Sequence, residues 1–153
     1  MNALELKVPP PVVALVLALA MWAVSRLTPT FEVDARLRIV AAIAIALVGV
    51  AFSVAGVTAF RRAKTTLNPT KPEAASSLVT GGIYRVTRNS MYVGLLFVLI
   101  GWTVFLCAPW ALAGPLAFVA YMTRFQIAPE ERTLGSVFGE AYASYKARVR
   151  RWL

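Results

Sequence analysis

Long apolar runs alternate with short polar segments along this chain, and the lengths of the runs suit a lipid bilayer. One run covers Val12 to Leu27 and the next covers Ile39 to Phe60. A hydrocarbon core about 30 Å thick needs roughly 20 helical residues, so each run predicts a transmembrane helix. No charge occurs from Asn89 to Thr123, and one helix of that length would reach ~52 Å. That stretch is therefore predicted to fold back on itself.

The fold-back is predicted at Cys107 to Trp110. Pro109 cannot donate a backbone hydrogen bond, and it biases the residue before it away from helix. Arg88 and Arg124, at the two ends of the stretch, would then return to the same membrane face. The pattern predicts an all-α integral membrane protein with four transmembrane helices, the last two of which form a helical hairpin.

The tail from Pro129 to Leu153 has the pattern of an amphipathic helix. Its apolar residues recur at spacings of three and four, while its charged residues lie elsewhere on the helical wheel. We expect this C-terminal helix to be cytosolic, lying along the headgroups or capping the bundle. For everything beyond Gly139, a surface anchor with no part in catalysis is the alternative interpretation.

Composition supports the membrane class and limits the chemistry. Of the 153 residues, 59% are hydrophobic and 15% are charged, whereas soluble domains carry about 25% charged residues. A single Cys excludes an internal disulfide and a multi-Cys metal site, and the lack of His removes the commonest zinc ligand and general base. We therefore expect no metal, and any chemistry must proceed without imidazole.

The basic residues indicate membrane topology more simply than nucleic-acid binding. The net charge is +9, but Lys and Arg flank the apolar runs and form no long stripe, which is typical of attraction to anionic headgroups. With four spans, 13 of the 16 Lys and Arg residues fall on one face, and three lie between Arg26 and Arg38. Both termini are therefore predicted to face the cytosol, in the cytoplasmic membrane if the chain is bacterial.

The first two runs each leave a second interpretation open. Ala18-Leu19-Ala20 is a weak match to a signal-peptide cleavage site, although apolar character continues past it. Gly49 and Gly56 in the second run could allow close helix approach, or they could reflect the general frequency of glycine in transmembrane helices.

Two polar clusters interrupt the apolar pattern and carry the candidate chemistry. The first runs from Leu78 to Tyr92 and combines Tyr, Arg, Asn and Gly, and the second runs from Arg124 to Arg132 and includes Glu130 and Glu131. The hairpin would bring both clusters to one interface. Aromatic faces, guanidinium groups, carboxylates and glycine backbone together suit a small charged ligand. We expect the two clusters to hold a cofactor there.

Several motifs follow one another in the second half of the chain. They are Leu78-Val79-Thr80-Gly81-Gly82-Ile83-Tyr84, Arg88-Asn89-Ser90-Met91-Tyr92-Val93-Gly94, Glu130-Glu131, and Phe138-Gly139-Glu140-Ala141-Tyr142 with Tyr145-Lys146 and Val149. In these motifs the chain resembles the isoprenylcysteine carboxyl methyltransferase family, and phospholipid methyltransferases share the pattern. The resemblance covers about residue 68 to the end. It divides the chain into two N-terminal helices, residues 1–60, and a cofactor-binding half, residues 61–153.

The resemblance implies transfer of a methyl group from S-adenosylmethionine to a lipophilic acceptor at the cytosolic membrane face. The cofactor-contacting residues that it implies are Ser76, Ser77, Leu78, Val79, Tyr84, Arg88, Asn89, Ser90, Met91, Tyr92 and Glu130. Chemically, Glu130 can accept hydrogen bonds from the cofactor's amino group or ribose, and Arg85 or Arg88 can pair with its carboxylate.

The chain departs from the family pattern at three positions. Asn89 stands in place of the usual His, and Ser90 stands in place of Pro. Asn can form hydrogen bonds but cannot carry a proton, which weakens an acid/base role there, whereas Asn is a favoured N-cap. Gln126 lies where eukaryotic relatives place a substrate-contacting Arg, and Arg124 is the candidate to replace it.

The implied reaction is an in-line displacement at the methyl carbon. A sulfonium is already an activated donor, so catalysis would consist mainly of positioning and water exclusion. Because the chain has no His, an acceptor that is already ionised needs the least help. A carboxylate or thiolate acceptor entering from the bilayer is therefore favoured, and Glu131 is the nearby candidate base.

Two other classes of protein remain as alternatives. A four-helix exporter would have a similar size. Proton-coupled export needs an ionisable residue inside a span, however, and none of the predicted spans has one in its interior. A non-catalytic scaffold, or a degenerate relative, would bind no methyl donor. A soluble-type methyltransferase is disfavoured because no strand-glycine-helix fingerprint occurs.

Overall fold

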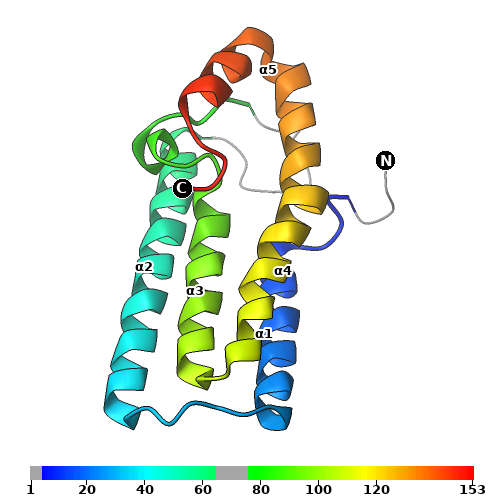
Figure 1. The fold of residues 1–153 in the computed structure, drawn as a ribbon. Coiled ribbons are helices and arrows are strands. Elements are labelled where there is room, and N and C mark those ends of the chain that lie inside the picture. Colours follow the sequence, from blue (N-terminus) through cyan, green and yellow to red (C-terminus); the bar gives the residue numbers. More distant parts are fainter. Residues whose placement is uncertain (1–4, 65–75) are drawn as a thin grey trace.

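The structure, a computed structural model, describes residues 5–64 and 76–153, and these ranges are helical apart from loops and one isolated bridge. The elements are α1 Pro10–Leu27, α2 Ala35–Arg62, η2 Gly82–Arg85, α3 Ser90–Leu106, η3 Pro109–Leu112, α4 Ala113–Tyr121, η4 Met122–Ile127 and α5 Ala128–Arg148. In Figure 1, α1 to α4 lie side by side as a bundle, and α5 extends beyond it. Most of the predicted basic segment from residue 61 to 73 lies outside the described residues.

The two predicted N-terminal helices are confirmed as helices. Among the described residues, α1 and α2 are the two helices long and apolar enough to cross a membrane, while α3 is apolar but shorter, with 17 residues. The start of α2 is fixed by Asp34, whose Oδ1 accepts hydrogen bonds from Arg36 N and Leu37 N at 3.1 and 3.0 Å. Crossing of the membrane by α3 and α4 stays a prediction.

Glycines allow α2 and α3 to pack with their backbones close together. A Cβ added at Gly49 would lie 2.5 Å from the carbonyl oxygen of Gly94, which is closer than real atoms allow. On the same interface, Ser90 Oγ donates a hydrogen bond to Phe52 O at 2.7 Å. Close approach is therefore the correct interpretation of Gly49.

The predicted interruption at residues 107–110 is confirmed. Helix α3 ends at Leu106, Cys107 adopts a left-handed conformation with φ 50°, and Pro109 begins η3. The chain then runs back beside α3 as one nearly continuous helical rod made of α4, the π-helix η4 and the first part of α5 (Figure 1).

Helix α1 packs against α3 and α4 and completes the main core. Trp102 Nε1 donates to Ala18 O at 3.0 Å, and Gly114 leaves space for the side chain of Met21. The buried residues of this core are Val13, Ala14, Met21, Tyr92, Leu99, Ala108, Ala111, Phe118, Met122 and Ile127.

The tail is not the single continuous helix that its pattern predicts. Gly139 has φ 50° and ψ −126°, values that break α5 and favour glycine. The second part of α5 turns over the end of the bundle and ends at Arg148 (Figure 1). Residues 149–153 then return to the start of α3, where Arg88 N donates to Arg150 O at 3.0 Å.

Candidate functional site

The two polar clusters meet at the N-terminal end of α3. Tyr92 Oη donates a hydrogen bond to Glu130 Oε2 at 3.0 Å, although the two residues are 38 positions apart. Gln126 also hydrogen-bonds the Tyr92 side chain, and it is 2% exposed. Gln126 and Glu130 are four residues apart on the rod and so share one face. The predicted meeting of Tyr92 and Glu130 is confirmed.

Three buried tyrosines, Tyr84, Tyr142 and Tyr145, form a second cluster, here called the tyrosine layer. Tyr145 Oη donates to Tyr84 O at 2.8 Å, and Tyr142 lies in the same cluster. Leu78 and Val79 are partly buried against these rings. The loop after α2, η2 and the second part of α5 therefore hold one another through aromatic packing.

Glu130 lies in an environment that disfavours its charged form. Desolvation by burial raises the pKa of Glu130 from its ordinary value of 4.5 to about 7. The hydrogen bond from Tyr92 acts in the opposite direction, and the adjacent charge of Glu131 raises the pKa further. Within the described part of the chain, no cation lies within ion-pair distance of Glu130.

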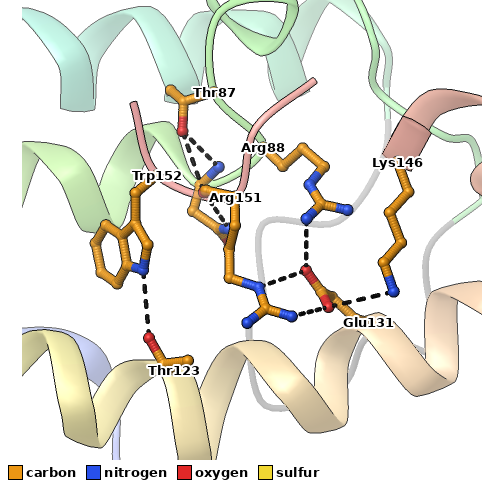
Figure 2. A network of polar contacts seen from close by, with 8 residues as sticks. Thr87, Arg88, Thr123, Glu131, Lys146, Arg151 and Trp152 are labelled. Atoms are coloured by element: carbon orange, nitrogen blue, oxygen red, sulfur yellow. Dashed lines mark hydrogen bonds and ion pairs between the residues drawn. The ribbon is translucent and has the colours of Figure 1, made fainter. Parts of the chain in front are cut away.

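Glu131 lies in the opposite kind of environment (Figure 2). Its carboxylate pairs with Arg88 at 3.0 Å, with Arg151 at 2.7 Å and with Lys146 at 3.8 Å. The Arg88 and Glu131 side chains are 8% and 9% exposed. Because three cations hold this carboxylate, its geometry favours a structural role, and the role of general base stays a prediction.

Arg88 keeps hydrogen-bonding capacity that its own surroundings do not use. Its Nη2 contacts Glu131, while Nε and Nη1 are buried and have no hydrogen-bond partner among the described residues. A buried donor without a partner is costly, so binding of an anionic group by these two nitrogens would be favourable.

Other predicted cofactor residues direct their side chains to backbone carbonyls or into helix packing. Ser76 Oγ contacts Lys64 O at 3.5 Å and Ser77 Oγ contacts Ala63 O at 3.2 Å, both at the end of α2. Met91 lies against Gly56 in the α2–α3 interface, close to the Ser90 contact.

Asn89 is the N-cap residue of α3, as predicted, but its side chain makes no capping hydrogen bond. Instead, Asn89 Nδ2 donates to Arg151 O at 2.8 Å. The side-chain amide holds the returning tail, and as a neutral donor it can do so without any change of protonation.

Arg124 points away from Glu130 toward the N-terminal segment. Its Nη1 pairs with Glu5 Oε1 at 3.2 Å, and Arg132 Nη2 pairs with Glu5 Oε2 at 2.8 Å. The Arg124 side chain is 53% exposed. A role for Arg124 in contacting the acceptor stays a prediction that this geometry does not favour.

An open groove of about 410 Å³ adjoins the tyrosine layer. Its lining comes from the loop before α3 and from the end of α5: Thr80, Gly81, Arg85, Tyr145, Arg148 and Val149. Small-molecule sites span roughly 300–1,000 Å³, so the groove is large enough for a ligand, and its lining includes two arginines and no carboxylate.

Sequence spacing does not predict that Arg151, Lys146 and Glu5 are ion-pair partners in this region. Arg151 lies in a run of basic residues that looks like a solvated helix face. The contact between Arg151 and Glu131 depends on the break at Gly139, and a helical wheel does not show such a break. The only local signal in the sequence is the glycine itself, because glycine readily adopts the positive φ observed there.

Comparison with known proteins assigns the family. The profile described as phospholipid methyltransferase matches residues 37–141. An uncharacterized protein of Haemophilus influenzae is 46% identical over 63 residues, which are 41% of this chain and all of that protein. No solved structure matches the chain.

Other curated relatives that match are methyltransferases, and two of them are described here. Protein-S-isoprenylcysteine O-methyltransferase of Xenopus laevis is 40% identical over 74 residues, covering 48% of this chain and 25% of that enzyme. Protein-S-isoprenylcysteine O-methyltransferase A of Arabidopsis thaliana is 36% identical over 80 residues, covering 50% of this chain and 39% of that enzyme. The match thus spans a quarter to two fifths of the length of these enzymes. Since the family profile covers more than half of the chain, including Tyr92 and Glu130, the chain belongs to the phospholipid methyltransferase family.

Proposed function

We propose that this protein is an integral membrane methyltransferase that uses S-adenosylmethionine at the cytosolic face and methylates a lipophilic acceptor. Family membership supports the reaction class. The observation that carries the proposal is the contact between Tyr92 and Glu130, together with Arg88, which pairs with the adjacent Glu131 and has two buried nitrogens without a hydrogen-bond partner among the described residues. Within the described ranges, a carboxylate that pairs with no cation and a guanidinium with unused donors together suit a zwitterionic ligand.

The residues present fit the charged groups of S-adenosylmethionine. Arg88 Nε and Nη1 are donors of the kind that bind a carboxylate. Glu130 accepts a hydrogen bond from Tyr92 and forms no ion pair with any residue that the structure describes. Its carboxylate therefore suits the amino group of the ligand. The rings of Tyr84 and Tyr92 are 4% and 5% exposed and suit a sulfonium through cation–π attraction.

When bound, the donor would supply a methyl group attached to a positively charged sulfur, and the neutral thioether that leaves needs no proton. The protein's own contribution is then to bind, orient and exclude water. Tyr92 holds Glu130 through its hydroxyl group. Tyr84 and Tyr92 are both buried, which keeps water away from their rings. Three cations already hold Glu131, so this candidate base is poorly suited to take a proton from the acceptor. The proposed acceptor is therefore one that is already ionised, such as a carboxylate or a thiolate.

We propose four membrane spans, with α3 and the segment from η3 to η4 forming the second pair. Large apolar side chains lie exposed along α1 and α2, including Leu15 and Leu47 at 61% each, and lipid would cover them. The site then lies at the membrane face that carries most of the Lys and Arg residues, which is the cytosolic face. The acceptor enters from the bilayer.

The test is transfer of a labelled methyl group. Membranes containing the protein are incubated with labelled S-adenosylmethionine, and the lipid-soluble product that takes up the label is identified. Glu130→Ala should reduce the rate at least tenfold, since it removes a charge-assisted contact worth roughly 1.5–3 kcal/mol. Glu140→Ala is the matched control, because Glu140 is an exposed residue of the same helix. Absence of donor binding by the purified wild-type protein would favour a non-catalytic scaffold.

A further inference from the structure

Residues 149–152, here called the strap, lie alongside the loop that leads into α3. The backbones of Arg150 and Thr87 form an isolated parallel bridge, and Arg88 N donates to Arg150 O at 3.0 Å. Asn89 Nδ2 adds a second hydrogen bond, to Arg151 O at 2.8 Å. The strap therefore fixes the backbone on both sides of the Arg88 side chain. It lies beyond residue 141, where the match to the family profile ends.

The end of the strap is anchored to the rod. Trp152 Nε1 donates to Thr123 Oγ1 at 3.3 Å, and the Trp152 ring packs against the main core (Figure 2). The strap thus connects the loop before α3, which carries Arg88, with η4. Helix α5, which carries Glu130 and Glu131, follows directly after η4.

Arg151 is bound to Glu131 through both carboxylate oxygens. Its Nε donates to Oε1 at 3.0 Å and its Nη2 donates to Oε2 at 2.7 Å. Arg88 reaches the same carboxylate through Nη2 alone, at 3.0 Å from Oε1. A carboxylate can accept a bidentate guanidinium pair, and Arg151 takes that position.

We infer that Arg151 is a positioning residue: by occupying both oxygens of Glu131, it keeps Arg88 in single contact and leaves two Arg88 nitrogens for the carboxylate of the methyl donor. The inference rests on the proposed function, because it assigns those nitrogens to the donor. Without Arg151, Oε2 keeps only the longer contact with Lys146, at 3.8 Å, and a second nitrogen of Arg88 can take the position that Arg151 held. The guanidinium would then turn onto Glu131 and its remaining donors would leave the ligand.

The inference predicts a loss of affinity that depends on the ligand's carboxylate. Two probes separate this from a general loss of structure: S-adenosylhomocysteine, which carries the amino-acid group, and methylthioadenosine, the nucleoside thioether that lacks it. Calorimetry on the purified full chain should show that Arg151→Ala raises the Kd of S-adenosylhomocysteine about tenfold, the effect of one charged hydrogen bond. The Kd of methylthioadenosine should change less than twofold.

The matched control is Arg150→Ala. Arg150 is an exposed neighbour of the same type, and its backbone carbonyl rather than its side chain makes the contact with Arg88. This variant should bind both probes like the wild type. Arg151→Lys keeps the charge but cannot form the fork, so it should restore part of the affinity. If Arg151→Ala does not fold, Arg151→Lys carries the same comparison.

Two results would overturn the inference while leaving the proposed function intact. One is unchanged affinity of Arg151→Ala for both probes, which would mean that the strap does not act on the site. The other is an equal loss for both probes, which would make the strap a general structural element. A wild-type protein that binds neither probe would instead remove the proposed function, and the inference with it.

Discussion

Glu130 and Glu131 are consecutive residues in the first turn of α5, yet they have opposite surroundings. Glu130 accepts a hydrogen bond from Tyr92, and burial raises its pKa to about 7. Glu131 contacts Arg88, Lys146 and Arg151. Consecutive helical residues point about 100° apart, so one turn of helix can serve two different regions.

The difference separates what the fold needs from what a ligand could use. The Glu131 side has its cations built in, and removing the carboxylate would leave the buried guanidinium group of Arg88 without its ion-pair partner. The Glu130 side has a carboxylate and no cation among the described residues, so a cationic ligand would gain by binding there. The asymmetry supports a structural role for Glu131 and a ligand-binding role for Glu130, and the following changes test it.

The largest expected effect is loss of stability in Glu131→Ala. Removing this carboxylate leaves the Arg88 side chain, 8% exposed, without its ion-pair partner. Breaking a buried pair on one side costs roughly 3–5 kcal/mol. Thermal unfolding in detergent should show a markedly lower midpoint than wild type. A midpoint equal to that of the exposed control Glu140→Ala would contradict the structural role.

Glu130→Gln should affect donor binding rather than folding. The substitution keeps an acceptor for Tyr92 but removes the charge, so the Kd of S-adenosylmethionine should rise about ten- to hundredfold. The ligand-free protein should be no less stable than wild type at pH 8, because the lost charge was desolvated in the folded state. Calorimetry and thermal unfolding measure the two effects separately. A destabilised variant with unchanged affinity would reverse the assignment of the two glutamates.

The pH dependence follows from the raised pKa of Glu130. The folded protein holds this proton more tightly than the unfolded chain, so the contribution of Glu130 to stability is present below pH 4.5 and is lost as the pH rises through about 7. Donor binding has the opposite trend, because it needs the charged form. The Kd should fall about fivefold between pH 6 and pH 7, and Glu130→Gln should remove this dependence. An equal slope in both proteins would assign the titration to another group.

The smallest effect is expected for Tyr92→Phe. The substitution keeps the buried ring but removes the hydroxyl that donates to Glu130 Oε2 at 3.0 Å, a hydrogen bond worth about 1 kcal/mol. Because that bond lowers the pKa of Glu130, its removal should shift the pH dependence of donor binding to higher pH. Affinity measured from pH 6 to pH 8 checks the shift. A curve identical to wild type would mean that the hydroxyl does not act on Glu130.

Much of the fold could be predicted from the sequence because it depends on local signals. Run length predicted α1 and α2, and Pro109 predicted the interruption after α3. The close approach at Gly49 was one of two open interpretations, since a glycine alone does not reveal its neighbour. The break at Gly139 was missed, because an amphipathic pattern continues across it with little change.

The candidate site was predictable where motif residues lie on the bundle itself. The contact between Tyr92 and Glu130 follows from the two ends of one uncharged stretch returning to the same end of the bundle. The partners of Glu131 and the role of the Asn89 side chain were not predictable. Both depend on where the chain goes after a reversal, which is a tertiary property without a local signal.

The reversal at Gly139 also makes one buried carboxylate depend on residues that come much later in the chain. The ion pair between Glu131 and Arg151 can form only after residues 149–152 have been synthesised. Helices α1 to α4 precede these residues in the sequence and can form earlier. If the proposed function is correct, a nascent chain that stops before Arg151 should bind the methyl donor more weakly than a chain that includes it.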